Sequence, residues 1–193
     1  INGGIDVQAL VTLQADQRHI QDGGHALGQF GLADAGRAFD EDRLLQVERQ
    51  VDRGGELPGT DVVDIREAGR KVKQPDGSEV QVPGKLKTVK GIGWYIEEYG
   101  IAQLSLNLTD ITVTPVHIAF DEACQSAAER GIRVTGSELV GLIPKQSLLD
   151  AADFYLARQQ RSLGVSEHEK IKIAVKSLGL DDLGPFDPQK KVI

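Results

Sequence analysis

Two short runs joined by a tight turn, the second with alternating apolar residues, constrain the fold of this chain more than any other feature. Residues 89–97 are followed by Tyr99-Gly100 and then by residues 101–109. In the second run every even position from 102 to 108 is apolar, and the polar residues Gln103, Ser105 and Asn107 stand between them. This alternation is typical of a half-buried strand with a polar opposite face. We therefore expect an antiparallel hairpin.

Three stretches downstream of this hairpin have helical spacing. Thr114 and Pro115 are expected to be the N-cap and the first residue of the first helix, and Gly131 its C-terminal cap. The expected helices cover residues 115–130, 144–160 and 166–178, the last with a Ser166/Glu169 capping box. Between the first two we expect a strand at 132–143, broken by Gly136 and Gly141, and after the third an extended tail at 185–193.

The order strand, strand, helix, strand and then two helices predicts an α+β fold. We expect a ferredoxin-like plait, with an antiparallel sheet and helices on one face, plus extra C-terminal helices. A complete βαββαβ plait needs one more strand and helix before Gly91, where only a helix-like end at 62–70 and a small hairpin around Pro75-Asp76-Gly77 are evident. The first strand and helix are thus missing or replaced, which would leave interior sheet edges unpaired.

The composition changes sharply near residue 61. Residues 1–60 contain five arginines and no lysine, whereas all 11 lysines lie between Lys71 and Lys191. We divide the chain into a poorly structured or non-native segment at 1–61 and a domain at 62–193. The first segment could be a linker, a separate small module, or a stretch that is not genuine coding sequence. Within it, residues 5–13 are the best candidate for a replacement strand and residues 40–51 for a replacement helix.

Composition also limits the possible functions. A net charge of −7 without a strong basic tract argues against nucleic-acid binding. No apolar run reaches the roughly 20 residues of a membrane span, and the single Cys124 fits a reducing compartment, so we expect a cytoplasmic protein without membrane contact. Because the chain begins at Ile1 and contains no methionine, we expect a fragment of a longer protein.

Self-contained catalytic or metal chemistry is not evident in the residue pattern. The four histidines are scattered, and no pair has the spacing of a metal site. We expect His117 to be a capping or surface residue rather than a general base, and Cys124 to be a packed thiol. Ser137 has no partner histidine nearby in sequence, so no catalytic triad is predicted.

Several long, ordered stretches resemble the glutamate formimidoyltransferase family, in the C-terminal subdomain of its formiminotransferase domain. The matching stretches are Asp-Ile-Arg-Glu-Ala-Gly-Arg (64–70), Lys-Gly-Ile-Gly-Trp-Tyr-Ile-Glu-Glu (90–98), Ala-Gln-Leu-Ser-Leu-Asn-Leu (102–108) and Thr-Pro-Val-His (114–117). They continue with Gly-Ser-Glu-Leu-Val-Gly-Leu-Ile-Pro (136–144), Leu-Leu-Asp-Ala (148–151), Lys-Ser-Leu-Gly-Leu (176–180) and Pro-Phe (185–186). The resemblance covers about residues 62–193.

This resemblance implies transfer of a formimidoyl group from N-formimidoyl-L-glutamate to tetrahydrofolate, a co-substrate, in histidine degradation and without a metal. It implies two ferredoxin-like subdomains with folate in a tunnel between them, and a general acid/base histidine in the N-terminal subdomain. That subdomain has no counterpart here, so no catalytic residue is assigned. We expect this chain to supply one tunnel wall, to need the N-terminal subdomain as partner, and to be inactive alone. The alternative is a non-catalytic folate-binding or oligomerisation module, such as a homodimer.

The candidate folate-binding and substrate-binding residues lie on the two runs of the hairpin. They are Lys90, Gly91, Gly93, Trp94, Gln103, Ser105 and Asn107. The polar strand face offers hydrogen-bond donors and acceptors, Trp94 a stacking plane, and Lys90, with Lys85 and Lys87, positive charge before a glycine turn. An ordinary solvated strand face and a solubilising edge explain the same polar and basic residues equally well.

Overall fold

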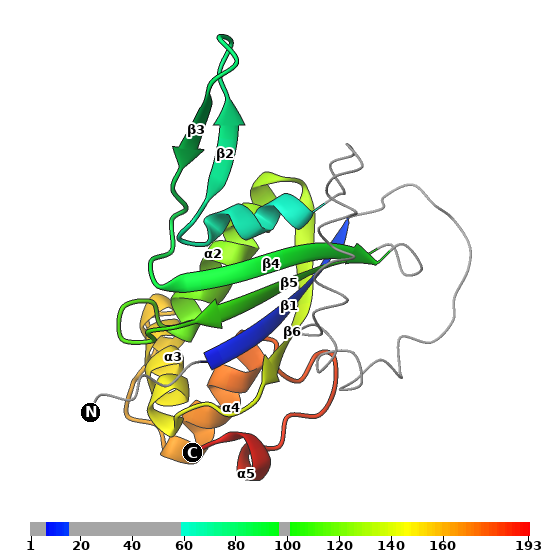
Figure 1. Ribbon diagram of the computed structural model, residues 1–193. Coiled ribbons are helices and arrows are strands. Elements are labelled where there is room, and N and C mark those ends of the chain that lie inside the picture. The colour runs from blue at the N-terminus through cyan, green and yellow to red at the C-terminus, as the bar shows by residue number, and fades with distance from the viewer. Residues whose placement is uncertain (1–6, 16–58, 97–100) are drawn as a thin grey trace.

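A four-stranded antiparallel sheet forms the centre of the molecule (Figure 1). The computed structural model describes residues 7–15, 59–96 and 101–193, the first of these as backbone only. The strand order is β4-β5-β1-β6, and every neighbouring pair is antiparallel. The strands are β1 (Val7–Ala15), β4 (Val89–Ile96), β5 (Ile101–Leu108) and β6 (Ile132–Val140).

The predicted hairpin is confirmed. Strands β4 and β5 pair from Val89↔Leu108 to Ile96↔Ile101. The apolar positions of β5 are buried as its alternation requires, with Leu104, Leu106 and Leu108 no more than 1% exposed. These three leucines anchor the main hydrophobic core between the sheet and the helices.

The expected replacement strand is also confirmed, two residues further along than predicted. Strand β1 pairs with β5 on one side and with β6 on the other. The expectation of unpaired interior edges is therefore wrong, because β1 supplies the missing hydrogen-bonding partner of both strands. The replacement helix predicted at 40–51 lies outside the described residues.

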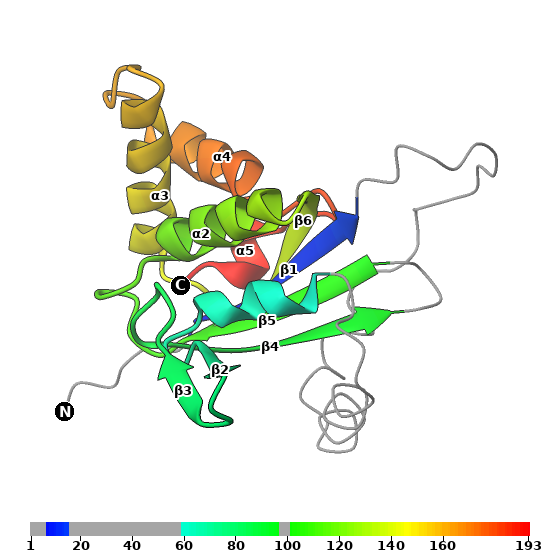
Figure 2. The same ribbon diagram turned by 90° about the horizontal axis from the view of Figure 1, so that it is seen from above.

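The longer helices lie on one face of the sheet (Figure 2). They are α2 (Val116–Glu129), α3 (Lys145–Arg158) and α4 (Glu167–Ser177). Helix α2 buries Val116, Ala119, Ala123 and Ala127 of the apolar stripe that its spacing predicts, while Phe120 of the same stripe is partly buried. Gly131 follows the helix with a φ of 71°. Ser166 caps α4 by accepting a hydrogen bond from the amide of Glu169. The extra C-terminal helices are thus confirmed.

The predicted start of α2 is wrong in detail. Pro115, not Thr114, occupies the N-cap position, and no side chain caps this end. The Thr114 hydroxyl instead donates to the backbone oxygen of Lys87, 2.5 Å away in the loop before β4. The hydroxyl is thus directed at a backbone oxygen distant in sequence and does not cap the first turn of the helix.

Two expectations about the last third of the chain are corrected. Strand β6 is continuous through Gly136, where a shift in register with β1 absorbs the irregularity and where a Cβ would lie 2.9 Å from the side chain of Leu183. The tail is not simply extended, since Asp187 caps the short helix α5 (Pro188–Lys191). After α5, Val192 forms a parallel bridge with Ile143.

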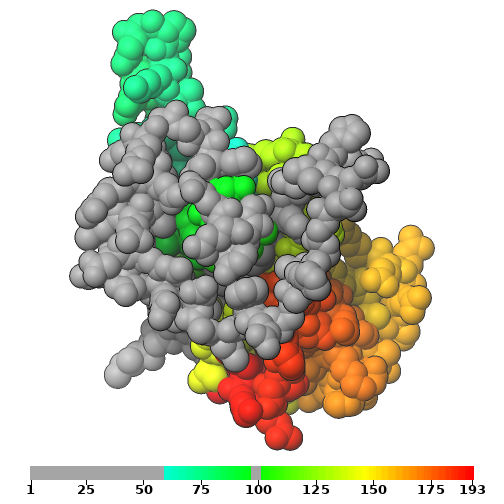
Figure 3. Space-filling view, turned by 90° about the vertical axis from the view of Figure 1, so that its right-hand side faces the viewer, coloured from blue at the N-terminus to red at the C-terminus, as the bar shows by residue number. Residues whose placement is uncertain are grey.

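The segment before β4 contains the remaining elements. The helix-like end predicted at 62–70 is a short 3-10 helix, η1 (Thr60–Ile65), which buries Val62 and Ile65. Strands β2 (Arg70–Lys73) and β3 (Glu79–Val82) then form the hairpin expected around the Pro75-Asp76-Gly77 turn. This hairpin projects from the body of the molecule (Figures 1 and 3).

Candidate functional site

The register of β4 and β5 places five of the seven predicted residues on one face of the sheet. Lys90 lies opposite Asn107, and Trp94 lies opposite Gln103. Ser105 stands between Gln103 and Asn107 on β5, opposite Ile92. Because directly opposed residues of an antiparallel pair point to the same side, these side chains share a surface. Their neighbours Leu104 and Leu106 point to the helix side and belong to the core. We call the surface that carries Lys90, Trp94, Gln103, Ser105 and Asn107 the polar sheet face.

Gly91 and Gly93 lie on the opposite side, under η1. A Cβ on Gly91 would lie 2.8 Å from the Leu106 side chain, and one on Gly93 only 2.6 Å from the backbone oxygen of Thr60. These glycines therefore let η1 lie directly on the sheet. The structure does not bring them together with the other five predicted residues.

Burial and unsatisfied hydrogen bonding single out Asn107 and its neighbours on the polar sheet face. Ser105 is 3% exposed and Trp94 is 7% exposed. The Oδ1 atom of Asn107 is buried, and none of the described residues is its hydrogen-bond partner. A buried amide oxygen without a donor costs free energy, so this atom is suited to accept a hydrogen bond from an N–H group of a ligand.

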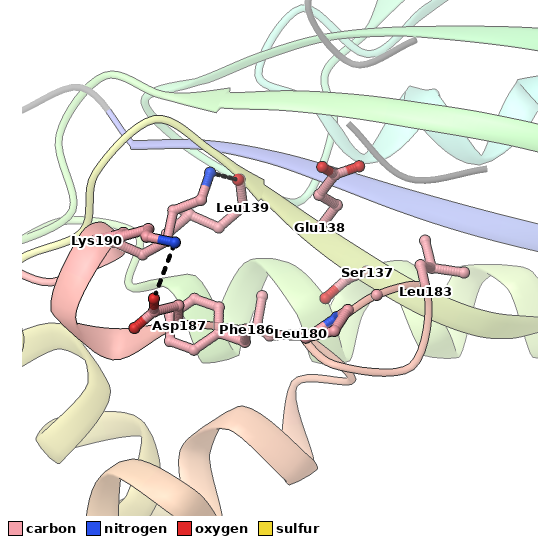
Figure 4. Close-up of a pocket in the computed structure, with 11 residues that line it drawn as sticks. Ser137, Glu138, Leu139, Leu180, Leu183, Phe186, Asp187 and Lys190 are labelled. Carbon is pink, nitrogen blue, oxygen red and sulfur yellow. Dashed lines mark hydrogen bonds and ion pairs between the residues drawn. The ribbon is translucent and has the colours of Figure 1, made fainter. Parts of the chain in front are cut away.

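Glu138 is a candidate that the sequence analysis did not select. The residue lies opposite Leu10 of β1, which in turn lies opposite Ser105 of β5, so the Glu138 side chain belongs to the polar sheet face. Figure 4 shows it on the other side of β6 from Ser137. Burial raises the pKa of the Glu138 carboxyl, and the positive charge of Lys191 partly offsets this rise.

A half-buried carboxyl group on the polar sheet face can exchange a proton or accept hydrogen bonds from an amine or amide. Alternation in the Ser137-Glu138-Leu139 run could have shown which way Glu138 points. The sequence pattern alone does not show that β6 lies two strands away from β5.

The predicted lysine cluster is divided by the fold. The Nζ atom of Lys85 lies 2.5 Å from Glu122 and 3.8 Å from Glu129, both on α2. Lys90 instead belongs to β4 on the polar sheet face, and among the described residues none forms an ion pair with it. Lys90 therefore contributes positive charge to this face without Lys85.

The other reactive side chains have structural environments. The His117 imidazole is 7% exposed and lies 4.6 Å from the Phe154 ring, so it is a core residue rather than a capping or surface residue. Burial lowers the pKa of this imidazole, and Asp150 and Asp121 partly oppose the change. Burial raises the pKa of the Cys124 thiol to about 11, which fits a packed thiol.

Neither Ser137 nor a metal cluster adds to the polar sheet face in the described segments. Ser137 donates its hydroxyl hydrogen to the backbone oxygen of Leu178 and is 2% exposed. In residues 59–96 and 101–193 no group of three His, Cys, Asp or Glu side chains is placed to hold a metal ion. No helix in this part of the chain is long and apolar enough to cross a membrane.

Comparison with known proteins identifies a domain over most of the described chain. The sequence profile of the formiminotransferase domain matches residues 60–193. The chain is 46% identical to formimidoyltransferase-cyclodeaminase of Gallus gallus over 138 residues, which are 72% of this chain and 24% of that protein. It is 46% identical to the Mus musculus protein of the same name over 131 residues, 68% of this chain and 23% of that protein.

A shorter relative shows a more limited match. The chain is 33% identical to glutamate formimidoyltransferase of Streptococcus pyogenes serotype M1 over 97 residues, 50% of this chain and 30% of that protein. The chain thus spans about a quarter of the length of the two formimidoyltransferase-cyclodeaminases and under a third of the streptococcal protein.

Proposed function

Because the chain belongs to the formiminotransferase domain family, we propose that residues 62–193, together with β1, act as one wall of a folate-binding transferase site. The reaction is transfer of the formimidoyl group of N-formimidoyl-L-glutamate to tetrahydrofolate. The chain is the C-terminal subdomain of such an enzyme and is inactive without the N-terminal subdomain, which supplies the general acid/base histidine.

The strand order supports a ferredoxin-like plait as the framework of this wall. A βαββαβ plait places its first strand between the third and the fourth, with antiparallel neighbours throughout. Here β1 lies between β5 and β6, and α2 connects those two strands. The β2–β3 hairpin is then an insertion before the second strand of the plait.

The observation that carries the proposal is the polar sheet face. The described helices lie on the other side of the sheet (Figure 2), so this face is the one that can be turned toward a second subdomain. The face combines an Asn107 amide oxygen that has no partner among the described residues, a carboxyl with a raised pKa at Glu138, and a cation at Lys90.

These groups suit the chemistry of a folate. The amino and amide N–H groups of a pterin need acceptors such as the Asn107 oxygen and the Glu138 carboxyl, and the glutamate carboxylates need a cation such as Lys90. Trp94 adds an apolar indole beside them. Gln103 and Ser105 contribute further polar side chains between the two ends.

Titration with 5-formyltetrahydrofolate, a stable folate, tests the proposal. We expect measurable heat of binding only when the N-terminal subdomain of a glutamate formimidoyltransferase is mixed with this chain. Asn107→Ala should weaken binding about tenfold, the typical cost of leaving a ligand donor without its acceptor. The matched control is Gln125→Ala on the exposed side of α2, where the amide contacts Glu129. Formimidoyl transfer by the purified chain alone would refute the assignment of a missing catalytic subdomain.

A non-catalytic assembly module is the second candidate function. An unpaired interior edge would favour such assembly, but β1 pairs with both strands at that position. Light scattering after size exclusion distinguishes the transferase from the assembly module. A monomer that binds folate only with the N-terminal subdomain supports the transferase. A stable homo-oligomer without folate binding supports the assembly module.

A further inference from the structure

A cavity that is separate from the polar sheet face lies at the outer edge of β6 (Figure 4). Its volume is about 200 Å³. The walls come from β6 and from the segment between α4 and the C-terminus, and they are mostly apolar. The apolar wall residues are Leu139, Leu180, Leu183, Pro185 and Phe186.

The outer edge of β6 turns backbone groups toward this cavity. The amide of Ser137 donates to the backbone oxygen of Gly179 at 2.9 Å, and the backbone oxygen of Leu139 accepts from Lys191 Nζ at 3.0 Å. Both groups therefore point away from β1. In a regular strand the N–H and C=O of one residue point to the same side, so the Leu139 N–H also faces the cavity. Within the described segments, no hydrogen-bond acceptor is assigned to this N–H.

The charged residues that line the cavity are two carboxylates and two lysines, and one of these lysines, Lys191, has donors directed at β6. Lys190 is 81% exposed, and its Nζ lies 3.4 Å from Asp187 at the rim. Glu138 also lines the cavity, with its side chain on the other side of β6 from Ser137 (Figure 4), and burial raises the pKa of its carboxyl while the positive charge of Lys191 lowers it. Lys191 uses one ammonium hydrogen for the Leu139 oxygen and keeps two that can reach a ligand. The Leu139 N–H and the Lys191 ammonium are thus two donors beside an apolar wall.

We propose that this cavity binds a small apolar monocarboxylate, separately from the transferase site. The carboxylate oxygens accept hydrogen bonds from the Leu139 N–H and the Lys191 ammonium, and the hydrocarbon part lies against Leu180, Leu183 and Phe186. The volume limits the ligand to a short branched or single-ring compound, because drug-sized ligands fill pockets of about 300–1,000 Å³.

The test is a titration of the ¹⁵N-labelled full chain with 4-methylpentanoate, followed by ¹H–¹⁵N correlation spectra. We expect a saturable shift of the Leu139 amide with a dissociation constant on the order of 1 mM. The neutral 4-methylpentan-1-ol should bind at least about tenfold more weakly, because it cannot accept charge-assisted hydrogen bonds.

Two variants of Lys191 separate charge from folding. Lys191→Met should weaken binding about tenfold or more, whereas Lys191→Arg should retain most of it. Lys190→Gln at the exposed rim is the matched control and should change the affinity less than threefold. An unshifted Leu139 amide at saturating carboxylate, or equal binding of the acid and the alcohol, would overturn the proposal. Folate binding by the mixed subdomains is measured separately, so failure of either proposal leaves the other intact.

Discussion

Replacing Gly93 by alanine tests whether this glycine serves the packing of η1 on the sheet. The added Cβ would lie 2.6 Å from the backbone oxygen of Thr60 and 3.3 Å from the Thr60 carbonyl carbon. The nearest atom belongs to backbone, so it cannot move aside as a flexible side chain could. The 3-10 helix must shift by several tenths of an ångström and loosen the contacts of Val62 and Ile65, both buried.

The expected cost follows from two opposing effects. Overpacking of a well-packed contact destabilises a protein by about 1–3 kcal/mol. Loss of backbone freedom in the unfolded chain returns about 0.4–1 kcal/mol when glycine becomes alanine. We therefore expect a net loss of about 1–2 kcal/mol in the free energy of unfolding. With a urea dependence of about 2 kcal/mol per molar, the unfolding midpoint falls by about 0.5–1 M.

Urea unfolding followed by the fluorescence of Trp94, the single tryptophan, measures this change. Gly184→Ala is the matched control, because a Cβ there has no atom within 4 Å and the residue has no positive φ. This control should be unchanged or slightly more stable. If Gly93→Ala has the same midpoint as Gly184→Ala, the close approach of η1 to the sheet is not real and Gly93 must be explained in another way.

Three further perturbations probe buried titratable groups. The folded state lowers the pKa of His117 below 6.5, so the unfolded chain binds the proton more readily. The free energy of unfolding should therefore be highest above about pH 6.5 and decline as the pH falls below it. His117→Asn should flatten this decline in urea midpoints measured from pH 8 to pH 5. The folded state raises the pKa of Glu138 above 4.5, so ionisation of this carboxyl near neutral pH opposes folding. Glu138→Gln should therefore be more stable than the unaltered chain at pH 7, and the difference should vanish toward pH 4.5. An unchanged thermal midpoint at pH 7 would contradict this. Burial keeps the Cys124 thiol protonated, so Ellman's reagent at pH 8 should react at least about tenfold more slowly with the folded chain than with the chain in urea.

Local periodicity was enough to predict the hairpin and the helices. The alternation in β5 fixes which residues are buried, because successive side chains of a strand point to opposite faces. The spacing of Ala119, Ala123 and Ala127 likewise identifies the buried side of α2. Residues 5–13 were recognisable as a strand from their own pattern, and the missing position in the expected topology indicated where it pairs.

The sequence interpretation failed where a distant backbone group decides the outcome. Thr114 looks like an N-cap, yet its hydroxyl donates to Lys87, 27 positions earlier. Gly91 and Gly93 resemble ligand-contacting glycines, but the structure places η1 against them. Asp187 and Pro188 form an ordinary helix start, although the tail was expected to be extended, so this local pattern is sufficient to predict α5.

Glu138 and Asn107 show why the candidate site could be predicted only in part. They lie 31 positions apart and face the same way only because β1 separates β5 from β6 by one strand. Two strand spacings place β5 and β6 about 10 Å apart. A flat sheet surface of that width contacts only one side of a flat ligand. The opposite side of such a ligand needs a second surface, which in our proposal is the N-terminal subdomain with its general acid/base histidine. The one-sided geometry of this wall is the reason why the mixing experiment measures folate binding with and without that subdomain.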